Sequence, residues 1–215
     1  MPKILGIDEA GRGCVLGSLY VCGCCYETDS DDSLLKKLGA TDSKKLSAKK
    51  RTLVLDLLKE HVHVHTVEIT AQQIDAGNIN SLEEEAFVEI IKKYAPDIVY
   101  IDAPTHPRGI LAVQRRLEQQ LAPHIALPTF IIEPKADFRY PIVGAASIFA
   151  KVQRDKALET MGPVGSGYPS DPVTKQWLEQ LLRNNVALPD FVRTRWGTIE
   201  NIQQSISAPV QQKLL

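Results

Sequence analysis

Four acidic residues stand at or just beyond the ends of apolar segments that are typical of strands. They are Asp8, Glu9, Asp102 and Asp137. Because the ends of neighbouring strands meet at one edge of an open α/β sheet, we expect the four carboxylates to gather there. Taken singly, each acid is more typical of a turn former or a helix cap.

The chemistry that such a group could support is metal-dependent hydrolysis. Carboxylates held close together repel one another unless cations neutralise them. Ligand sets made only of oxygen favour Mg²⁺ or Mn²⁺. Two such ions, roughly 3.5–4 Å apart, can activate a water and stabilise a leaving oxygen in phosphodiester cleavage. The acids therefore predict a two-metal nuclease centre.

Three other segments carry groups suited to binding a nucleic acid. Gly11-Arg12-Gly13 lets a backbone approach a phosphate or a sugar hydroxyl closely, although a tight turn between strands explains it equally. Ser43 and Lys44 could contact phosphates, although they also suit a helix-capping loop. Tyr168 stands in a Gly/Pro-rich segment, where its ring either packs or offers a stacking platform for a sugar or base.

The histidines His61, His63 and His65 recur at every second position. On a strand they would share one face, which is a possible zinc or nickel ligand set. Three imidazoles on the solvent face of an edge strand are the simpler interpretation, since no partner acid is evident.

The four cysteines all lie within one apolar stretch of twelve residues. They are Cys14, Cys22, Cys24 and Cys25. A zinc site would need a second ligand pair, and no cysteine follows Cys25. We expect small buried side chains, with Cys22 and Cys24 on one strand face and Cys25 on the other.

Apolar and alternating segments predict five strands, the first two antiparallel and joined by a loop that begins at Asp8. A bulge or a register change near Thr66 would reconcile the apolar residues of the third segment with one buried face. The predicted strands are Lys3–Ile7, Val15–Tyr26, His61–Ile69, Ile98–Ile101 and Thr129–Ile132.

Capping residues and periodicity predict the helices. Lys135-Ala136-Asp137 is expected to open a loop, and Gly144-Ala145-Ala146-Ser147 to let a long helix pack closely. Gly162–Pro172 is neither helix nor central strand. The expected helices lie within 30–38, from Ser47 to about Glu60, as a short turn within Ile74–Asn80, from a Ser81 cap to about Tyr94, over Arg108–Leu121, over Val143–Thr160, from Pro172 behind an Asp171 cap, and from Thr198 onward.

Length and composition suit an ordinary globular protein. The chain has 215 residues, of which 44% are hydrophobic and 24% charged, and a formal net charge of −1. The overall charge neither favours nor excludes nucleic acid, but bases outnumber acids between Lys135 and Trp196. We expect no signal peptide, because Met1 leads almost directly into a strand and a charged pair. We expect no membrane span, since no apolar run approaches roughly 20 residues.

Several motifs, in this order, resemble those of type 2 ribonucleases H, in the archaeal and eukaryotic branch of that family. The blocks are Gly6-Ile7-Asp8-Glu9-Ala10-Gly11-Arg12-Gly13, Asp42-Ser43-Lys44-Lys45-Leu46, Ile101-Asp102, Lys135-Ala136-Asp137, Ala145-Ala146-Ser147-Ile148-Phe149-Ala150-Lys151-Val152, Arg154-Asp155 and Gly165-Ser166-Gly167-Tyr168-Pro169-Ser170-Asp171-Pro172. They extend over most of the chain, up to about Trp196.

The resemblance implies an α/β fold: a ribonuclease H-like mixed sheet flanked by helices, with a helical C-terminal appendage. Residues 1–160 would be the catalytic domain, and residues 161–215 an extension carrying the tyrosine loop. Asp8, Glu9, Asp102 and Asp137 would be catalytic and would bind two Mg²⁺ or Mn²⁺ ions. Substrate would be bound by Gly11, Arg12, Gly13, Ser43, Lys44 and Tyr168.

The implied activity is endonucleolytic cleavage of the RNA strand of RNA–DNA hybrids, and cleavage at single ribonucleotides embedded in duplex DNA. The products would carry 5′-phosphate and 3′-hydroxyl ends. We expect a cytoplasmic monomer that acts in DNA replication or repair, with a possible sliding-clamp contact through the C-terminal tail. The alternatives are a non-catalytic nucleic-acid-binding module on the same fold and, more weakly, a metal-dependent phosphatase for small substrates.

Overall fold

The computed structural model describes residues 2–27, 33–40 and 46–207, which include a five-stranded sheet. The strands are β1 (Lys3–Ala10), β2 (Leu19–Glu27), β3 (His63–Ile69), β4 (Ile98–Asp102) and β5 (Thr129–Glu133). Their order across the sheet is β3-β2-β1-β4-β5. β1 is antiparallel to β2, and β2 to β3, whereas β4 runs parallel to both β1 and β5. A strand is present in each of the five predicted segments, and the antiparallel first pair is confirmed.

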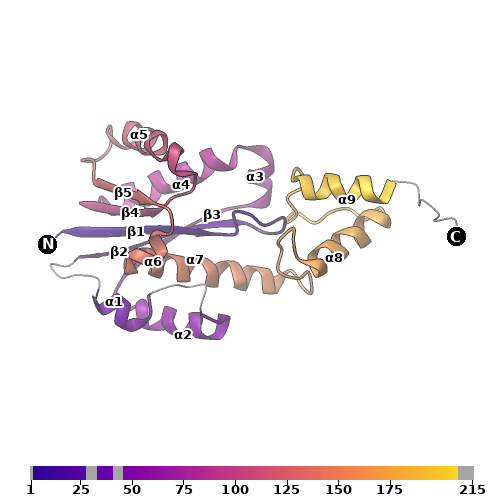
Figure 1. Cartoon of the computed structure of the whole chain (residues 1–215), viewed down its shortest axis with the longest axis horizontal. Helices are drawn as coiled ribbons and strands as arrows, with labels where there is room; N and C mark the ends of the chain where they lie inside the picture. Colours follow the sequence, from indigo (N-terminus) through magenta and orange to yellow (C-terminus); the bar gives the residue numbers. More distant parts are fainter. Residues whose placement is uncertain (1, 28–32, 41–45, 208–215) are drawn as a thin grey trace.

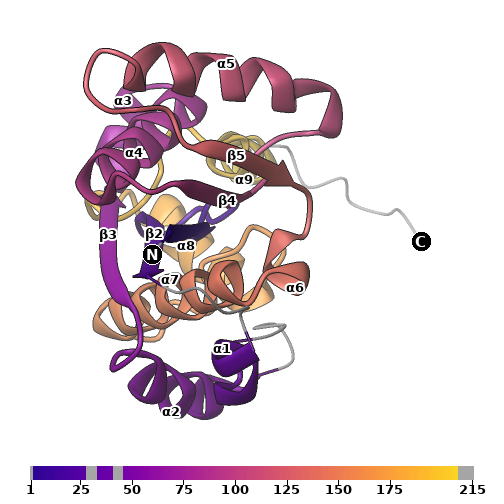
Figure 2. The same cartoon turned by 90° about the vertical axis from the view of Figure 1, so that its left-hand side faces the viewer.

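Helices cover both faces of this sheet. They are α1 (Ser33–Leu38), α2 (Ala48–Leu58), α3 (Ala71–Ala76), α4 (Ile79–Tyr94), α5 (Ile110–Leu121, preceded by the 3₁₀ turn Pro107–Gly109), α6 (Ala136–Arg139), α7 (Pro141–Thr160), α8 (Pro172–Arg183) and α9 (Gly197–Ser207). α4 and α5 lie on one face and α1, α2 and α7 on the other, while α8 and α9 extend beyond the end of the sheet (Figures 1 and 2). The expected mixed sheet flanked by helices is confirmed.

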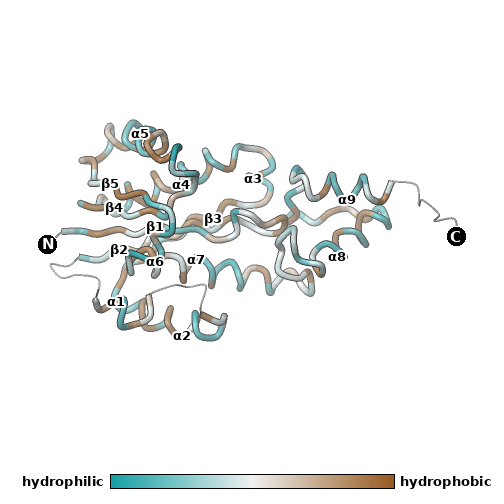
Figure 3. Tube along the Cα trace, in the orientation of Figure 1, coloured by the Kyte–Doolittle hydropathy of each residue, from teal (hydrophilic) through white to brown (hydrophobic). Residues whose placement is uncertain are grey.

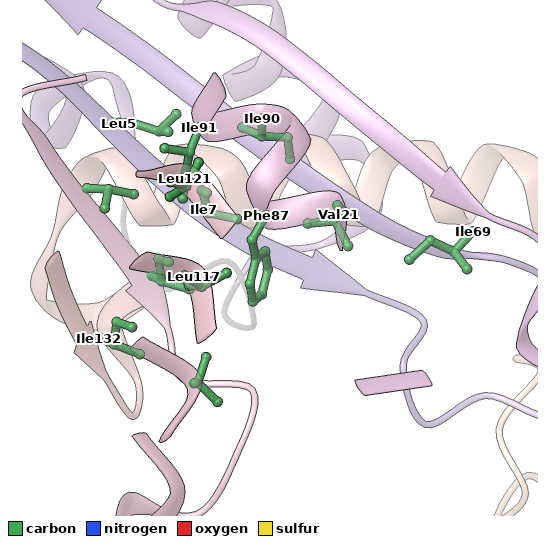
Figure 4. Close-up of a cluster of buried hydrophobic side chains, with 14 of the residues drawn as sticks. Leu5, Ile7, Val21, Ile69, Phe87, Ile90, Ile91, Leu117, Leu121 and Ile132 are labelled. Carbon is green, nitrogen blue, oxygen red and sulfur yellow. The ribbon is translucent and has the colours of Figure 1, made fainter. Parts of the chain in front are cut away.

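One hydrophobic core lies between the sheet and the pair α4 and α5 (Figure 4). Leu5 and Ile7 of β1 point toward it because side chains alternate along a strand. They belong to one cluster with Phe87 and Ile90 of α4 and Leu117 of α5, and all five are 0% exposed. Burial of each such side chain contributes about 1.5–3 kcal/mol, so this cluster anchors the strand that ends in Asp8 and Glu9.

On the opposite face, α7 packs against β1 more closely than ordinary side chains allow. A methyl group built on Gly6 would lie 2.5 Å from the carbonyl carbon of Ile142. One built on Gly144 would lie 2.9 Å from the carbonyl oxygen of Ala40. The residues from 144 to 147 are all buried, which confirms the close packing predicted for this small-residue segment.

The hydropathy of the chain follows these layers (Figure 3). Hydrophobic stretches run along the central strands, and α5 carries both hydrophobic and hydrophilic residues. In the described ranges, no helix combines the length and apolarity needed to cross a bilayer.

The cysteines are free and buried, as predicted. Cys22 and Cys24 belong to the core beneath α7, and Cys25 belongs to the core beneath α4. Their alternation along β2 confirms the expected division between the two faces. They act as small apolar residues of the sheet.

The first two strands have other bounds than the pattern predicts. β1 continues through Ala10, because Glu9 pairs with Val21 and Ala10 with Tyr20. The prediction that a loop begins at Asp8 is therefore wrong. β2 begins at Leu19 rather than Val15, because the residues before it bond to the C-terminal part of the chain. The ladder from Leu19–Ile69 to Cys25–His63 is continuous, so the suggested bulge near Thr66 is wrong.

Two helix starts also differ from the prediction. α4 is capped by Asn78, whose side chain accepts the N–H groups of Asn80 and Ser81, so the helix begins before the expected Ser81 cap. Lys135 adopts a left-handed conformation with φ 60°, and α6 starts directly after it. Asp137 is therefore in a short helix rather than a loop.

A third core joins the C-terminal segment to the N-terminal one. Val15 and Leu16 pack in it with Val164, Leu178 and Ile199. Leu16 also forms an isolated antiparallel bridge with Val192. This contact brings the segment that follows β1 beside the residues that follow α8.

Candidate active site

The predicted acids converge on one cleft, of about 370 Å³, at the carboxyl end of β1. Its lining also includes the glycine segment, Tyr168 and several bases. The lining residues are Asp8, Glu9, Ala10, Gly11, Arg12, Gly13, Arg51, Asp102, Asp137, Lys151, Arg154, Asp155 and Tyr168. The structure thus brings together all described residues that the sequence singled out for catalysis or substrate binding. Ser43 and Lys44 lie outside the described residues.

Asp8 and Glu9 lie near the C-terminal end of β1, with side chains on opposite faces of the strand. Asp8 is 4% exposed and lies on the α7 side, where Ser147 donates a hydrogen bond to it and Lys151 supplies a nearby positive charge. One Asp8 oxygen also accepts the backbone N–H of Glu9 at 2.7 Å. The pairing of β1 with β2 therefore fixes the backbone positions from which both carboxylate side chains extend.

Asp102 and Asp137 are linked through the start of α6. Asp102, the last residue of β4, accepts the backbone N–H of Ala136 at 2.8 Å. That bond holds the first turn of α6, on which Asp137 follows as the next residue and is 2% exposed. One carboxylate thus positions the other.

Burial and mutual repulsion disfavour the ionised forms of the β1 acids. Burial is the largest cause that raises the pKa of Asp8 to about 6, and the charge of Asp102 adds to it. Burial, followed by the charges of Asp8 and Asp102, raises the pKa of Glu9 well above its ordinary value. A cation placed among these groups would reverse both effects.

The donor set suits a hard divalent cation. All four acids offer oxygen, which Mg²⁺ and Mn²⁺ prefer. The buried Oε2 of Glu9 has no hydrogen-bond partner in the part of the chain that the structure describes. In that same part, no three acidic, histidine or cysteine side chains form a ready-made metal-binding group.

Three basic side chains, called the basic wall below, line the same cleft as the carboxylates. They are Arg51 from α2, and Lys151 and Arg154 from α7. Arg51 pairs with Asp155 at 2.7 Å, and the ammonium of Lys151 donates to the hydroxyl of Ser147 at 2.6 Å.

Ser147, Lys151 and Arg51 were not singled out individually from the sequence. The helical spacing of Ser147, Lys151 and Arg154, at i, i+4 and i+7, places the three on one face of α7 and could have shown two of them. Arg51 comes from a distant helix and left no such signal.

The glycine segment turns away from β1 directly after the acids. Gly11 has φ +94°, and a methyl group there would lie 2.6 Å from the carbonyl oxygen of Ser18, so this position requires glycine. The guanidinium of Arg12 binds Glu83 and Asn80 of α4. Its side chain is therefore held by the protein, and the segment presents mainly its backbone to the cleft.

Tyr168 also lines the cleft, from the loop before α8. Its ring is the nearest group to a methyl built on Gly13, at 3.8 Å, and the Arg154 guanidinium lies 5.0 Å from the ring centre. Arg154 also donates to the carbonyl of Ser166, while Asp171 accepts the N–H of Ser166 and caps α8 as predicted. Tyr168 is nevertheless 40% exposed, which leaves its ring accessible to a ligand.

The histidine series lies apart from the cleft. β3 is an edge strand, as expected, but it begins only at His63. His65 contacts Glu89 at 2.8 Å and Lys93 at 2.9 Å, both on α4. A partner acid that the pattern did not reveal is thus supplied by a helix of distant sequence.

The chain is similar to known proteins over nearly its whole length. The sequence profile of the ribonuclease HII family matches residues 5–199. A curated ribonuclease HII of Methanothermobacter thermautotrophicus is 39% identical over 214 residues, covering 94% of this chain and 100% of that protein.

Two solved structures are similar as well. The crystal structure of the ribonuclease H2 from Pyrococcus horikoshii OT3 superposes with a TM-score of 0.82 at 34% identity, covering 95% of this chain and 98% of the other. The ribonuclease HII solved in complex with PCNA from Archaeoglobus fulgidus gives a TM-score of 0.81 at 37% identity, covering 94% and 97%. The predicted ribonuclease H-like fold class is confirmed.

Proposed function

This chain belongs to the ribonuclease HII family, an enzyme family of metal-dependent hydrolases, and from that premise we propose which reaction its cleft performs. The protein cleaves the RNA strand of RNA–DNA hybrids and cuts at single ribonucleotides embedded in duplex DNA, leaving 5′-phosphate and 3′-hydroxyl ends. The observation that carries the proposal is the convergence of four carboxylates in one cleft that the basic wall also lines.

Asp8, Glu9, Asp102 and Asp137 are the proposed ligands of two Mg²⁺ or Mn²⁺ ions. Bound there, the ions would supply the charge that activates a water and stabilises the 3′ leaving oxygen. Hydrogen bonds within the protein orient two of these carboxylates for metal binding. Asp8 is oriented by the N–H of Glu9 and by Ser147, and Asp102 by the N–H of Ala136.

The basic wall is proposed to hold the phosphates of the substrate. Arg51, Lys151 and Arg154 stand on two helices that frame the cleft, so they can contact backbone phosphates while the scissile phosphate faces the acids. Such contacts carry no sequence information and make binding sensitive to salt.

Recognition of the ribonucleotide is assigned to Gly11, Arg12, Gly13 and Tyr168. The 2′-hydroxyl is the only group that distinguishes one ribonucleotide in a DNA duplex, and backbone groups of a glycine segment can approach it closely. The exposed ring of Tyr168 beside Gly13 can stack on the adjoining sugar or base. Ser43 and Lys44 are proposed to add phosphate contacts.

We further propose that residues 1–160 carry the catalytic acids and that residues 161–215 form an extension that completes the cleft with Tyr168. The third core, which joins Val15 and Leu16 to this extension, supports that division of roles. A sliding-clamp contact through the C-terminal tail is supported by the relative that was solved with PCNA. A monomer acting on DNA in a reducing compartment such as the cytoplasm is consistent with the free cysteines.

The decisive test is cleavage of a labelled DNA duplex that contains one ribonucleotide. The wild-type chain should cut it with Mg²⁺ or Mn²⁺ and not with EDTA, and Asp8→Asn should not cut it although its circular dichroism spectrum is unchanged. Cleavage by a folded Asp8→Asn protein would overturn the assignment. Tight binding without any cleavage would favour the alternative, a non-catalytic binding module, and hydrolysis of small phosphate esters alone would favour a phosphatase.

A further inference from the structure

Arg193, in the segment between α8 and α9, is a fully buried arginine that bonds to the backbone of the glycine segment. It is 0% exposed. Its guanidinium donates to the carbonyl oxygens of Gly11 at 2.7 Å, Arg12 at 2.9 Å and Gly17 at 2.9 Å. One side chain from the C-terminal part of the chain thus holds both ends of the turn that follows β1.

These bonds determine the direction of two N–H groups. A peptide unit is planar and trans, so its N–H points opposite to its C=O. The carbonyl of Gly11 shares a peptide unit with the N–H of Arg12, and the carbonyl of Arg12 shares one with the N–H of Gly13. Because both carbonyls point to buried Arg193, both N–H groups point away from it, on a segment that lines the cleft.

The position of Arg193 is itself fixed from several sides. Its backbone N–H donates to the carbonyl of Val15 at 2.9 Å, and its guanidinium lies 5.2 Å from the ring centre of Trp196. The next residue, Thr194, donates its N–H and hydroxyl to Asp75 of α3 at 2.6 and 2.7 Å. Burial lowers the pKa of Arg193 to about 10, so the group remains protonated at neutral pH.

We propose that Arg193 is a positioning residue for ribonucleotide recognition: it aims the N–H groups of Arg12 and Gly13 at the 2′-hydroxyl of the substrate. The inference rests on the proposed function, in which the glycine segment recognises the ribonucleotide. The guanidinium offers five N–H donors in a planar fork and so reaches three carbonyls at once. A lysine retains the charge but presents a single compact ammonium, which cannot reproduce the same three directions.

The test measures discrimination rather than activity. In an Asp8→Asn background, which should bind without cutting, affinities are measured for a DNA duplex with one ribonucleotide and for the same duplex with deoxyribose only. Arg193→Lys should reduce the ratio of the two affinities by about tenfold, the scale of one or two misdirected hydrogen bonds. Affinity for the all-DNA duplex should stay unchanged, because phosphate contacts come from other elements.

Arg195→Gln is the matched control, since that arginine is two residues away and exposed. It should leave the affinity ratio unchanged. Arg193→Gln is a harsher second variant, and thermal melting shows whether either variant is folded at the assay temperature. Arg193→Lys is the variant on which the inference depends.

The outcomes separate the two proposals. If the parent protein binds both duplexes equally, recognition by the glycine segment fails, and the proposed function must be revised. If the parent discriminates and folded Arg193→Lys keeps the full ratio, only the inference about Arg193 is overturned. An equal loss of affinity for both duplexes would show a merely structural role and would also overturn it.

Discussion

Two parts of the cleft are held in place by different interactions, one by the sheet and its hydrophobic cores and the other by side chains that bond to loops. The carboxylate floor, made of Asp8, Glu9, Asp102 and Asp137, stands on β1, β4 and the first turn of α6, above the sheet cores. The recognition rim, made of Gly11–Gly13 and Tyr168, consists of loops tied down by Arg193, Arg154 and Asp171. Changes in the floor should therefore affect the chemical step, whereas changes in the rim should affect the choice of substrate.

The largest effect is expected from Asp102, because this residue is a proposed metal ligand and also anchors α6. Asp102→Asn keeps an oxygen that can accept the N–H of Ala136 but loses the charge, so cleavage should fall by about 10²–10³-fold or more while the melting temperature holds. Asp102→Ala should lose activity and also lower the melting temperature, because α6 loses its anchor. Equal melting temperatures for the two variants would contradict this positioning role.

A smaller effect, confined to one substrate, is expected from the rim. Tyr168→Ala should lower the rate at a single ribonucleotide by about 5–150-fold, the equivalent of roughly 1–3 kcal/mol of stacking. The melting temperature should change little, since the ring is 40% exposed. Tyr168→Phe keeps the ring and serves as the control; a loss as large as that of Tyr168→Ala would assign the effect to the hydroxyl instead of stacking.

Changes in the basic wall should lower the affinity for every duplex by a similar factor. Lys151→Gln should weaken binding of all duplexes by a similar factor, because a phosphate contact does not depend on the base or the sugar. The slope of log affinity against log salt concentration should decrease by about 1. If instead the loss were limited to the ribonucleotide-containing duplex, Lys151 would belong with the recognition rim.

The smallest effect concerns the stability of the metal-free floor. Burial raises the folded-state pKa of Asp8 from 3.8 to about 6, so the folded chain binds that proton more tightly than the unfolded chain does. The free energy of unfolding contributed by this group therefore falls as the pH rises from about 4 to about 6, and it stays low above that. Asp8→Asn should remove this cost.

The measurement is a series of thermal melts in EDTA. The melting temperature of Asp8→Asn, relative to wild type, should increase between pH 4 and pH 7. A difference that does not change with pH would show that Asp8 ionises as freely in the folded protein as in the unfolded one.

The same contrast explains what the sequence could predict. The floor follows from local patterns: apolar runs predict the strands, and strand ends predict where Asp8, Glu9 and Asp102 meet. The rim depends on contacts between residues far apart in the chain, such as Arg193 with Gly11 and Arg12 with Glu83. No periodicity or capping rule encodes such pairs.

The mistaken boundaries have the same origin. Val15 and Leu16 look like the start of a strand, yet β3 ends at Ile69 opposite Leu19, and they bond to Gly167 and Val192 of the C-terminal segment instead. The sequence predicts a loop at Asp137, because nothing in it marks the start of α6. The residue before this helix, Lys135, adopts a left-handed conformation that is more usual for glycine. Tertiary contacts override local preference at both places, and both adjoin the cleft.

The glycine at position 6 limits how far the cleft could widen. Because α7 packs directly on the backbone of β1, the packing of the protein core fixes the distance between the acids of the strand and the bases of the helix. Any side chain at Gly6 would push α7 outward and carry Lys151 and Arg154 with it. Adaptation to a bulkier sugar modification would therefore have to come from the loop of Tyr168, since the distance across the floor cannot widen without repacking the whole sheet–helix layer.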